Sequence, residues 1–389
     1  MPGAKFNPLR RRPRVLVPDV VEEADFGPNP GHLRLLRYVP PGLKAGAPLV
    51  VVLHGCGQTA AGYGLGAGWF QLASEFGFAV LAPEQRAINN PHTCFNWFQP
   101  IDSQRGGGEA ASIRRMIVYM LDWYELDPAR VFITGLSAGG AMTAAMLAAY
   151  PEVFAGGAIV AGLPAGAAQN AREALEAMRA PPQRQPQAWS DAVRGASSHD
   201  GPWPVVSIWH GQEDPVVHPG NADASVTQWA GLHDIAHAQE DESEGHLRRR
   251  WRDGNGRLVL ESHAIAGLGH GTPIAMAQGH GMPAPFILEA GIPSSLHIAS
   301  FWGLTTDLTK DADAAPASAK PELHIVTETS PLAQIHARAA AQEADVTVEP
   351  GVPPVAQPQA PEETGAGPEI PMPVPAWSRR LRQWLGRWN

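Results

Sequence analysis

The chain has 389 residues, 44% of them hydrophobic, which suits a soluble globular protein of one large domain or two modest ones. Its 29 basic and 38 acidic side chains give a formal net charge of −9, so no overall positive field attracts nucleic acid. No apolar run reaches the roughly 18 residues that a membrane-spanning helix needs. Composition therefore argues against a nucleic-acid-binding protein and predicts a soluble one without a transmembrane segment.

Residues 1–31 precede the first regular pattern and are predicted to be an N-terminal extension. Basic residues occur there, but Pro13, Pro18 and the acidic residues that follow interrupt the apolar stretch that a secretion signal requires. We therefore expect no signal peptide and a cytoplasmic protein. The two cysteines, Cys56 and Cys94, are too few for a disulfide scaffold, and one disulfide between them stays open as an alternative.

Strand-like and helix-like patterns alternate over residues 32–305, the predicted catalytic domain. Helical patterns occur at 66–76 and 109–126, and an alanine-rich one follows Ser137. Between them lie the short apolar runs HLRLLRYV, APLVVVLHGCG, FAVLAPE, RVFITGLS, GAIVAGLP, WPVVSIWHG and LVLESHAIAGLGHG. Continuous apolar strands that alternate with helices indicate a mostly parallel sheet with helices on both faces, which is an α/β fold.

Three segments depart from this alternation. Residues 165–202 are irregular and polar, and are predicted to be an insertion that forms either a lid or an ordinary surface excursion. Residues 306–376 are rich in proline and acidic side chains and lack Phe, Trp and Tyr, so we expect a disordered linker. Residues 377–389 place Trp377, Trp384 and Trp388 at helical spacing among arginines, which predicts a short amphipathic segment that binds a granule or lipid surface. The alternative is a disordered end of the chain.

The stretch TGLSAGGAM holds the candidate nucleophile, Ser137. It follows the apolar run VFIT and precedes an alanine-rich helix, and Gly135-Leu136-Ser137-Ala138-Gly139 fits the pattern GxSxG. In α/β-hydrolases such a serine sits on a sharp strand-to-helix turn, where only small neighbours fit and the hydroxyl projects above the sheet. The alternative is a structural glycine-rich turn.

The same fold requires an acid and then a histidine further along the chain. Asp214 follows the strand SIWHG in a loop, and we assign it as the acid, with a turn-forming aspartate as the alternative. His270 lies between glycines after another strand, and we assign it as the general base. Other histidines compete for this role: His210, His218, His263 and His280.

Acyl transfer also needs two donors for the oxyanion. We expect the backbone amides of Ala138, next to the nucleophile, and of Cys56, in the loop after an early strand, to supply them. The neighbouring residues and the aromatic stretch CFNWF could line a substrate site or simply pack together: His54, Gly55, Phe95, Trp97 and Phe98. His233 and His237 lie four apart on an expected helix, but without a third ligand we predict neither a metal site nor a cofactor.

Several long motifs, in one order over Leu33 to Leu304, resemble the polyhydroxybutyrate depolymerase esterase family, which is related to feruloyl and acetylxylan esterases. They are LHGCGQTAAGY, CFNWFQPIDSQRGGGEAASI, TGLSAGGAMTAAMLAAYPEVFAGGAIVAGLP, GPWPVVSIWHGQEDPVVHPGNA, GLGHGTP and APFILEAGIPSSLHIASFWGL. The resemblance implies an α/β-hydrolase fold and a serine esterase that cleaves 3-hydroxyalkanoate esters. It also implies a pairing of Cys56 with Cys94, because members commonly carry cysteines in both loops.

The chain also departs from this family. Secreted polymer-degrading members begin with a signal and end in a folded substrate-binding domain, whereas this chain shows only the Trp- and Arg-rich segment at 377–389. The resemblance therefore leaves three locations open: the cytoplasm, a storage granule, or secretion. The substrate is expected to be a polyester or a small ester. A feruloyl or acetylxylan esterase, a hydrolase of another polyester or polyamide, and a catalytically idle granule-binding protein are the alternatives.

Overall fold

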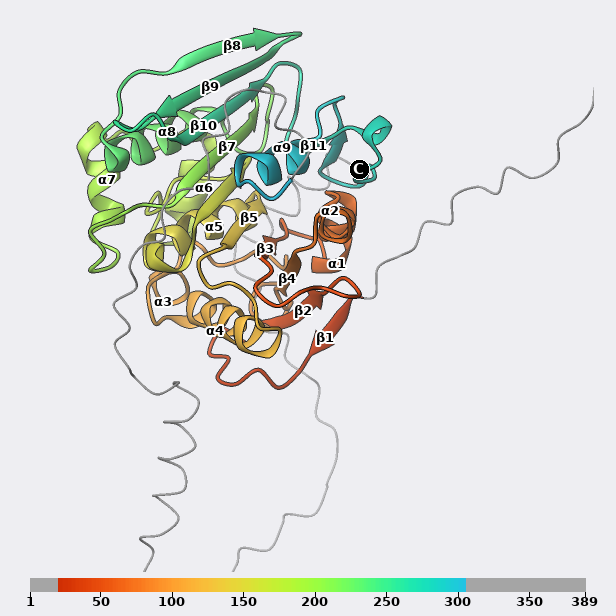
Figure 1. The fold of residues 1–389 in the computed structure, drawn as a ribbon. Helices are drawn as coiled ribbons and strands as arrows, with labels where there is room; N and C mark the ends of the chain where they lie inside the picture. The colour runs from red at the N-terminus through yellow and green to blue at the C-terminus, as the bar shows by residue number, and fades with distance from the viewer. Residues whose placement is uncertain (1–19, 306–389) are drawn as a thin grey trace, which may run out of the picture. The chain divides into compact units, whose positions relative to one another are not determined.

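A computed structural model describes residues 20–305, and a ten-stranded sheet forms its centre (Figure 1). The strands of this sheet are β1 (Val21–Glu23), β2 (Arg34–Tyr38), β3 (Leu49–Leu53), β4 (Ala79–Glu84), β5 (Val131–Leu136), β6 (Gly156–Val160), β7 (Val205–Gly211), β8 (Gln239–Ser243), β9 (His246–Arg252) and β10 (Leu258–Ile265). A separate parallel pair consists of β11 (Thr272–Ile274) and β12 (Ile287–Glu289).

Helices follow most of the inner strands. The α-helices are α1 (Ala60–Gly66), α2 (Trp69–Phe76), α3 (Pro100–Ser103), α4 (Gly108–Trp123), α5 (Ala138–Ala149), α6 (Ala171–Arg179), α7 (Pro186–Arg194), α8 (Gly220–His233) and α9 (Ser294–Phe301). Two short 3-10 helices lie at Pro151–Val153 and Met276–Gln278.

The inner strands β4, β3, β5, β6, β7 and β10 are neighbours in this order and run parallel. Every residue of β3, β5, β6 and β7 is buried, as expected for strands that are covered on both faces. The predicted mostly parallel α/β sheet is therefore confirmed. All of these strands end at one edge of the sheet, where the loops that carry function in open α/β folds lie.

The strands at both edges of the sheet pair in antiparallel fashion, which the alternation of strands and helices did not predict. On one side β2 pairs with β4 and β1 pairs with β2; on the other, β9 and β8 form a hairpin beside β10. Strand β1 precedes residue 32, where the catalytic domain is predicted to begin. A three-residue strand with mostly exposed side chains carries no alternating pattern from which it could be found.

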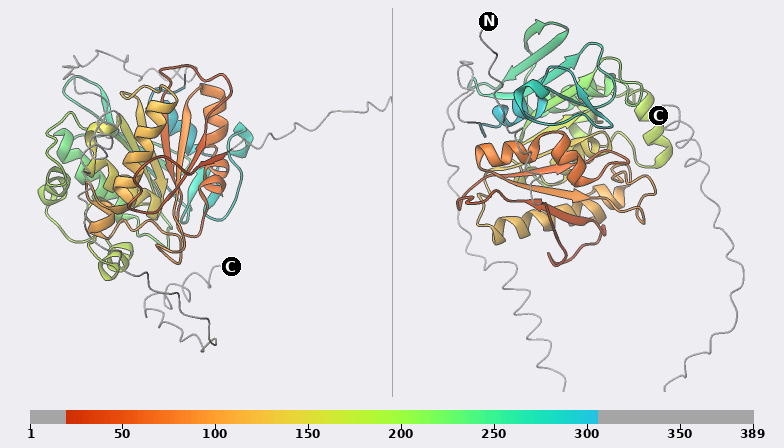
Figure 2. Two further views of the ribbon diagram at one scale, coloured as in Figure 1. Left: turned by 90° about the horizontal axis from the view of Figure 1, so that it is seen from below. Right: turned by 90° about the vertical axis from the view of Figure 1, so that its right-hand side faces the viewer.

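Two layers of helices cover opposite faces of the sheet, as Figures 1 and 2 show. Alternate residues of one strand serve different layers, because successive side chains of a strand point to opposite faces. Val51 and Leu53 pack in a core with α4, α5 and α8, whereas Val50 and Val52 pack in a second core with α1, α2 and α9. This double burial holds the loops at the carboxyl edge on a rigid base.

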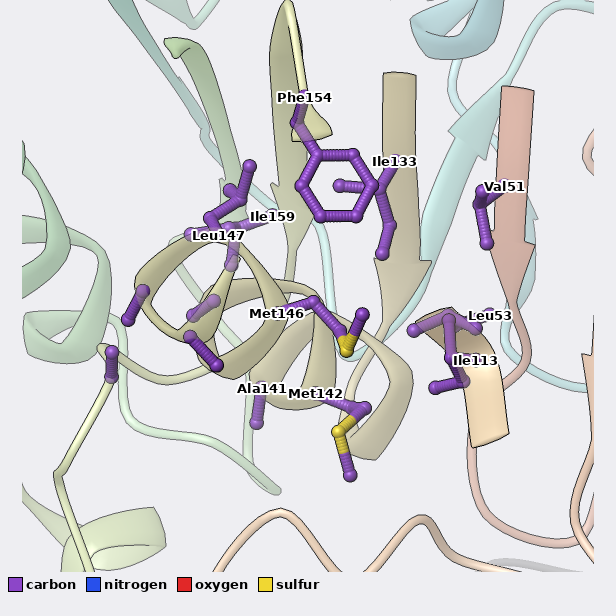
Figure 3. Close-up of a cluster of buried hydrophobic side chains, with 14 of the residues drawn as sticks. Val51, Leu53, Ile113, Ile133, Ala141, Met142, Met146, Leu147, Phe154 and Ile159 are labelled. Carbon is purple, nitrogen blue, oxygen red and sulfur yellow. The ribbon is translucent and has the colours of Figure 1, made fainter. Parts of the chain in front are cut away.

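Helix α5 lies directly against the sheet. Its residues are mostly Ala and Gly, so the helix backbone can approach closely, and its few long side chains fill the remaining space. Figure 3 shows Leu147 of α5 beside Ile159, in a cluster that also contains Met142, Met146 and Ile133. Leu147 rests on β6 at a glycine: a Cβ added to Gly157 would lie 2.4 Å from Leu147 Cδ1.

The segment 165–202 is more regular than its sequence suggested, because it forms α6 and α7. Helix α7 packs against α8 and buries Trp189 and Val193 in the core. Gln228 of α8 ties the segment down, since its side chain bonds the Ala165 amide and carbonyl at 2.9 and 3.0 Å. These contacts make residues 165–202 part of the packed domain.

Residues 1–19 of the predicted extension at 1–31 lie outside the described residues, as do the linker at 306–376 and the amphipathic segment with Trp377, Trp384 and Trp388. Those interpretations stay predictions. Of the helices found within residues 20–305, none combines the length and the apolar character that crossing a bilayer requires.

The packing of α5 predicts a large cost for truncating Leu147, which is fully buried. We expect Leu147→Ala to lower the free energy of unfolding by about 2–5 kcal/mol, because the void against β6 cannot close. Urea denaturation would measure it. Ile101→Ala, at a side chain that is 74% exposed, is the control and should cost less than about 0.5 kcal/mol. Equal costs would contradict this account of the core.

Candidate active site

Ser137 occupies a strained turn between β5 and α5. Its φ of 57° and ψ of −118° lie in a region that residues with a side chain rarely adopt. Two hydrogen bonds hold the turn: the Ser137 amide donates to the Val160 carbonyl at 2.9 Å, and the Ser137 carbonyl accepts from the Ala141 amide at 2.9 Å. The serine thus stands at the carboxyl edge of the sheet, where α5 begins.

The glycines around Ser137 are required by close backbone contacts. A Cβ on Gly139 would lie 2.4 Å from the Leu53 carbonyl oxygen and 2.6 Å from that of His54. A Cβ on Gly135 would lie 2.4 Å from the Gly139 carbonyl oxygen. The first turn of α5 therefore touches the end of β3, which brings the nucleophile turn beside the loop predicted to hold the oxyanion.

Asp214 and His270 meet at the same edge. His270 Nδ1 lies 2.7 Å from Asp214 Oδ2, and both side chains are buried. Because Nδ1 faces a carboxylate, it carries the proton, which leaves Nε2 as an acceptor for a serine hydroxyl. The structure thus joins the acid and the base by a direct hydrogen bond, and Ser137 lies at the same edge of the sheet. Within residues 20–305, no hydrogen bond joins Ser137 Oγ to the His270 ring.

The loop after β7 holds Asp214 as a carboxylate. Its Oδ1 accepts hydrogen bonds from the Val216 and Val217 amides at 2.8 and 2.9 Å. Burial alone would raise the pKa of Asp214, but hydrogen bonds from His210 and His270 outweigh burial and hold that pKa well below its usual range. The adjacent Glu213 is exposed, so Asp214 is the carboxyl group that serves this site.

The two predicted oxyanion donors lie on loops that touch. Gly55 sits beside the nucleophile turn, since a Cβ there would lie 3.4 Å from the Leu136 carbonyl oxygen. Among residues 20–305 the amides of Cys56 and Ala138 donate to no protein acceptor. Ala138 is also the first residue of α5, where the helix dipole favours negative charge. Both amides are thus free to bind a developing oxyanion.

The structure joins Cys56 and Cys94 by a disulfide with a Cα–Cα distance of 4.2 Å. This bond ties the oxyanion loop to the loop after β4. The buried Glu109 of α4 holds this second loop in place. Its carboxylate accepts a hydrogen bond from the Asn96 backbone amide at 2.8 Å, and further hydrogen bonds from the side chains of Asn96 and Gln85. Burial raises the pKa of Glu109 to about 8, although these hydrogen bonds act in the opposite direction.

Two residues of the predicted substrate wall lie inside the domain. His54 and Phe95 are both 0% exposed and pack against each other, so neither side chain reaches the surface in this structure. His54 instead braces the oxyanion loop: its Nε2 accepts from the Gln85 amide, and its Nδ1 therefore donates to the Gly55 carbonyl at 2.8 Å. Burial lowers the pKa of His54, which keeps the ring neutral.

The rest of that predicted wall also packs inside. Gly55 and Trp97 are buried, and Phe98 is half-buried with its ring edge-on to that of Trp97 at a centroid distance of 5.5 Å. Of this set, Phe98 retains the most exposed surface. The pattern CFNWF is mainly a packing cluster, and the sequence left that alternative open.

Three of the competing histidines are engaged away from Asp214. His263 contacts Glu261 and His246, His280 contacts Glu75, and His218 is exposed and accepts the Gly220 amide. His210 behaves differently, because its Nε2 lies 3.0 Å from Asp214 Oδ2. The sequence predicts His210 only as a competitor for the base. Its position near the end of β7, four residues before Asp214, is the signal for its contact with the acid.

Phe286 is a neighbour of the site that the sequence did not reveal. Its ring stands edge-on to the His270 ring at 5.7 Å, and its φ of 63° marks a strained turn. The Phe286 carbonyl accepts the Thr272 amide, and the preceding Pro285 carbonyl accepts Gln58 from the oxyanion loop. The β11–β12 pair thus closes the site beside the base.

The described residues contain no group of three or more His, Cys, Asp or Glu side chains arranged to hold a metal ion. The two histidines weighed for such a site do not share a helix, because α8 ends at His233 and His237 follows in a loop. His233 instead contacts the Pro204 carbonyl at 3.0 Å.

Comparison with known proteins decides the family. Residues 33–251 match the family described as esterase PHB depolymerase. The chain belongs to this family. It is 41% identical over 291 residues to poly(3-hydroxyalkanoate) depolymerase C of Paucimonas lemoignei, and the match covers 73% of this chain and 70% of that protein. The expected resemblance is confirmed, and the protein is a carboxylic ester hydrolase.

Two further relatives are xylan esterases. An acetylxylan esterase of Coprinopsis cinerea is 32% identical over 67% of this chain and 71% of its own length. Among solved structures, an acetyl xylan esterase from Aspergillus awamori superposes with a TM-score of 0.62 at 25% identity, covering 74% of this chain and 99% of that one. The α/β-hydrolase fold is thus shared with esterases of this kind.

The contact between α5 and β3 predicts that Gly139→Ala will disable the site. A methyl group would meet two carbonyl oxygens at 2.4 and 2.6 Å, so the nucleophile turn and the oxyanion loop must move apart. We expect kcat/KM for p-nitrophenyl butyrate to fall by about 100-fold or more. Gly254→Ala, where nothing lies within 4 Å, is the matched control and should retain activity. Wild-type activity in Gly139→Ala would refute the proposed contact.

Proposed function

We propose that this protein hydrolyses the ester bonds of poly- or oligo-3-hydroxybutyrate and related 3-hydroxyalkanoates through an acyl-enzyme on Ser137. One observation carries the proposal: the strained Ser137 turn and the buried Asp214–His270 pair share one sheet edge. The chain that contains them is 41% identical to a poly(3-hydroxyalkanoate) depolymerase. The role of each residue is inferred from this geometry.

The first half of the reaction acylates the serine. His270 Nε2 removes the proton from Ser137 Oγ, which attacks the ester carbonyl carbon and forms a tetrahedral intermediate. The amides of Cys56 and Ala138 bind the oxyanion that develops on the carbonyl oxygen. When the bond from the carbonyl carbon to the ester oxygen breaks, His270 gives the proton to that oxygen, so the alcohol leaves and the acyl chain remains on Ser137.

The second half releases the acid. His270 removes a proton from water, whose oxygen attacks the acyl carbonyl, and the proton then passes to Ser137 Oγ as the acyl bond breaks. Asp214 keeps the imidazole in the tautomer with the proton on Nδ1 and stabilises its charged form in each step. No group outside the protein and water is needed for this balance.

A second candidate is a carbohydrate esterase that removes acetyl or feruloyl groups. The similarity to acetylxylan esterases, in sequence and at a TM-score of 0.62, favours it. Both candidates use the same acyl chemistry and differ in the chain on either side of the scissile ester.

A substrate panel tests the proposal. We expect kcat/KM for 3-hydroxybutyrate oligomers to be at least about tenfold higher than kcat/KM for acetylated xylan or for methyl ferulate, because the acyl site would be shaped for a hydroxyalkanoate. Solid polymer and p-nitrophenyl butyrate complete the panel, and product release is followed by titration of acid.

Ser137→Ala is the control. Because this variant lacks the nucleophile, its kcat/KM for every substrate that the enzyme hydrolyses should fall by about 1,000-fold or more. Retention of hydrolysis within a few-fold would refute the nucleophile assignment. A preference for acetylated xylan or methyl ferulate would establish the carbohydrate esterase instead. If a fluorophosphonate probe does not label the wild-type protein, a granule-binding protein without catalytic activity would be the better interpretation.

We further propose that residues 377–389 bind the surface of a hydrophobic granule or anionic lipid, and that the protein acts in the cytoplasm at such granules. The spacing of Trp377, Trp384 and Trp388 among arginines supports this. Deletion of 377–389 should reduce sedimentation with polymer granules several-fold and leave p-nitrophenyl butyrate turnover unchanged. Replacing only the three tryptophans by Ala separates apolar adsorption from charge; unchanged sedimentation in both variants would rule the proposal out.

A further inference from the structure

His210 is the last residue but one of β7, and its ring points at the acid of the site. Its Nε2 lies 3.0 Å from Asp214 Oδ2 and 2.8 Å from the Val217 carbonyl oxygen, and the residue is 3% exposed. Both neighbours of Nε2 are acceptors, so this nitrogen carries a proton and donates it. The acid therefore receives a hydrogen bond from a second imidazole besides that of His270.

This second imidazole completes the set of donors around the carboxylate. Asp214 Oδ1 accepts two backbone amides, and Oδ2 accepts His210 and His270. Within residues 20–305, His210 from β7 and His270 from the loop after β10 are the titratable side chains that contact Asp214. Two donors on each oxygen fix the plane of a carboxylate more firmly than one.

A merely structural histidine would not need the carboxylate. The Val217 carbonyl alone would satisfy Nε2, as the Pro204 carbonyl does for His233. His210 instead shares its proton with the oxygen that holds His270, and it does so from a strand whose seven residues are all buried. The rigid strand end thereby sets the direction of Asp214 Oδ2.

We propose that His210 is a positioning residue for acyl transfer: its Nε2–H, shared between Asp214 Oδ2 and the Val217 carbonyl, orients the carboxylate to accept the His270 Nδ1–H. This inference rests on the proposed function, in which His270 is the base and Ser137 the nucleophile. It assigns no contact between His210 and the substrate.

The proposal implies a defined change with pH. With His210 present, the pKa of Asp214 lies below its usual range, so the group is ionised at every pH at which the enzyme would work. Without this donor the desolvation of the buried carboxyl raises its pKa, and protonation at a higher pH removes the acceptor for His270. The acid limb of kcat/KM should therefore move to higher pH, and activity should be lost sooner as pH falls.

Three substitutions separate the donor from the ring. In His210→Gln the side-chain amide reaches about as far as Nε2 and can still donate to Asp214. In His210→Asn the amide is one methylene shorter and falls near the position of Nδ1. In His210→Leu the volume is kept and the donor is lost.

The chain supplies a matched control in His263. This histidine is also buried, lies on the neighbouring strand β10, and contacts a buried carboxylate, Glu261, at 3.2 Å. His263→Leu and His263→Gln repeat the same chemical changes away from Asp214. They report what the loss of any buried histidine-carboxylate pair does to folding.

The experiment measures kcat, KM and the pH profile of kcat/KM with p-nitrophenyl butyrate, together with thermal unfolding and the rate of fluorophosphonate labelling. We expect His210→Leu and His210→Asn to lower kcat by about tenfold or more, with KM within about threefold, and to move the acid limb up by about half a pH unit or more. His210→Gln should keep kcat within about threefold and the wild-type acid limb. The His263 variants should change only thermal unfolding.

Several outcomes would overturn the proposal. One is a loss of kcat in His263→Leu equal to that in His210→Leu, and another is a His210→Gln variant as impaired as His210→Asn. If His210→Leu does not fold, the comparison of Gln with Asn decides the matter alone. A His210→Gln variant that is inactive beside an active His270→Gln variant would make His210 the base. An inactive wild type would refute the proposed function and is recognised separately, before any variant is compared.

Discussion

The close contact of α5 with the end of β3 is the constraint on which the rest of the site depends. Gly139 can approach the Leu53 and His54 carbonyls only because it has no side chain, and Ser137, two residues earlier, occupies its strained turn beside this contact. The same contact sets Cys56 and Ala138 on adjoining loops. Strain at Ser137 persists because β5, β6 and α5 are packed on both faces and cannot relax around it.

A second layer of polar contacts holds the oxyanion loop without touching the site. His54, inside the domain, fixes the Gly55 carbonyl, and the disulfide joins Cys56 to the loop that Glu109 anchors. Both ring nitrogens of His54 and both carboxylate oxygens of Glu109 have hydrogen-bond partners, as buried polar atoms require. The aromatic rings that looked like a substrate wall serve the same purpose, because Phe95 packs beneath His54.

The acid shows how burial and hydrogen bonding can act against each other in one residue. Burial disfavours a charged Asp214, and only the two imidazoles and two amides around it keep it ionised. The site therefore depends on β7 as much as on the loop that carries the acid. Phe286, on a strained turn beside His270, limits the other side of the same imidazole.

The sequence by itself determined the elements of the inner sheet and the candidates Ser137, Asp214 and His270, because periodicity and short motifs are local properties of the chain. It could not determine which buried side chains face one another. The place of His54 and Phe95 beneath the oxyanion loop, the contact of His210 with Asp214, and the nearness of Phe286 to His270 all join residues that only the folded sheet brings together. The edge strands β1, β8 and β9 could not be predicted from the sequence for a related reason. Their exposed or charged side chains leave no apolar pattern, and pairing with an existing sheet is what makes them strands.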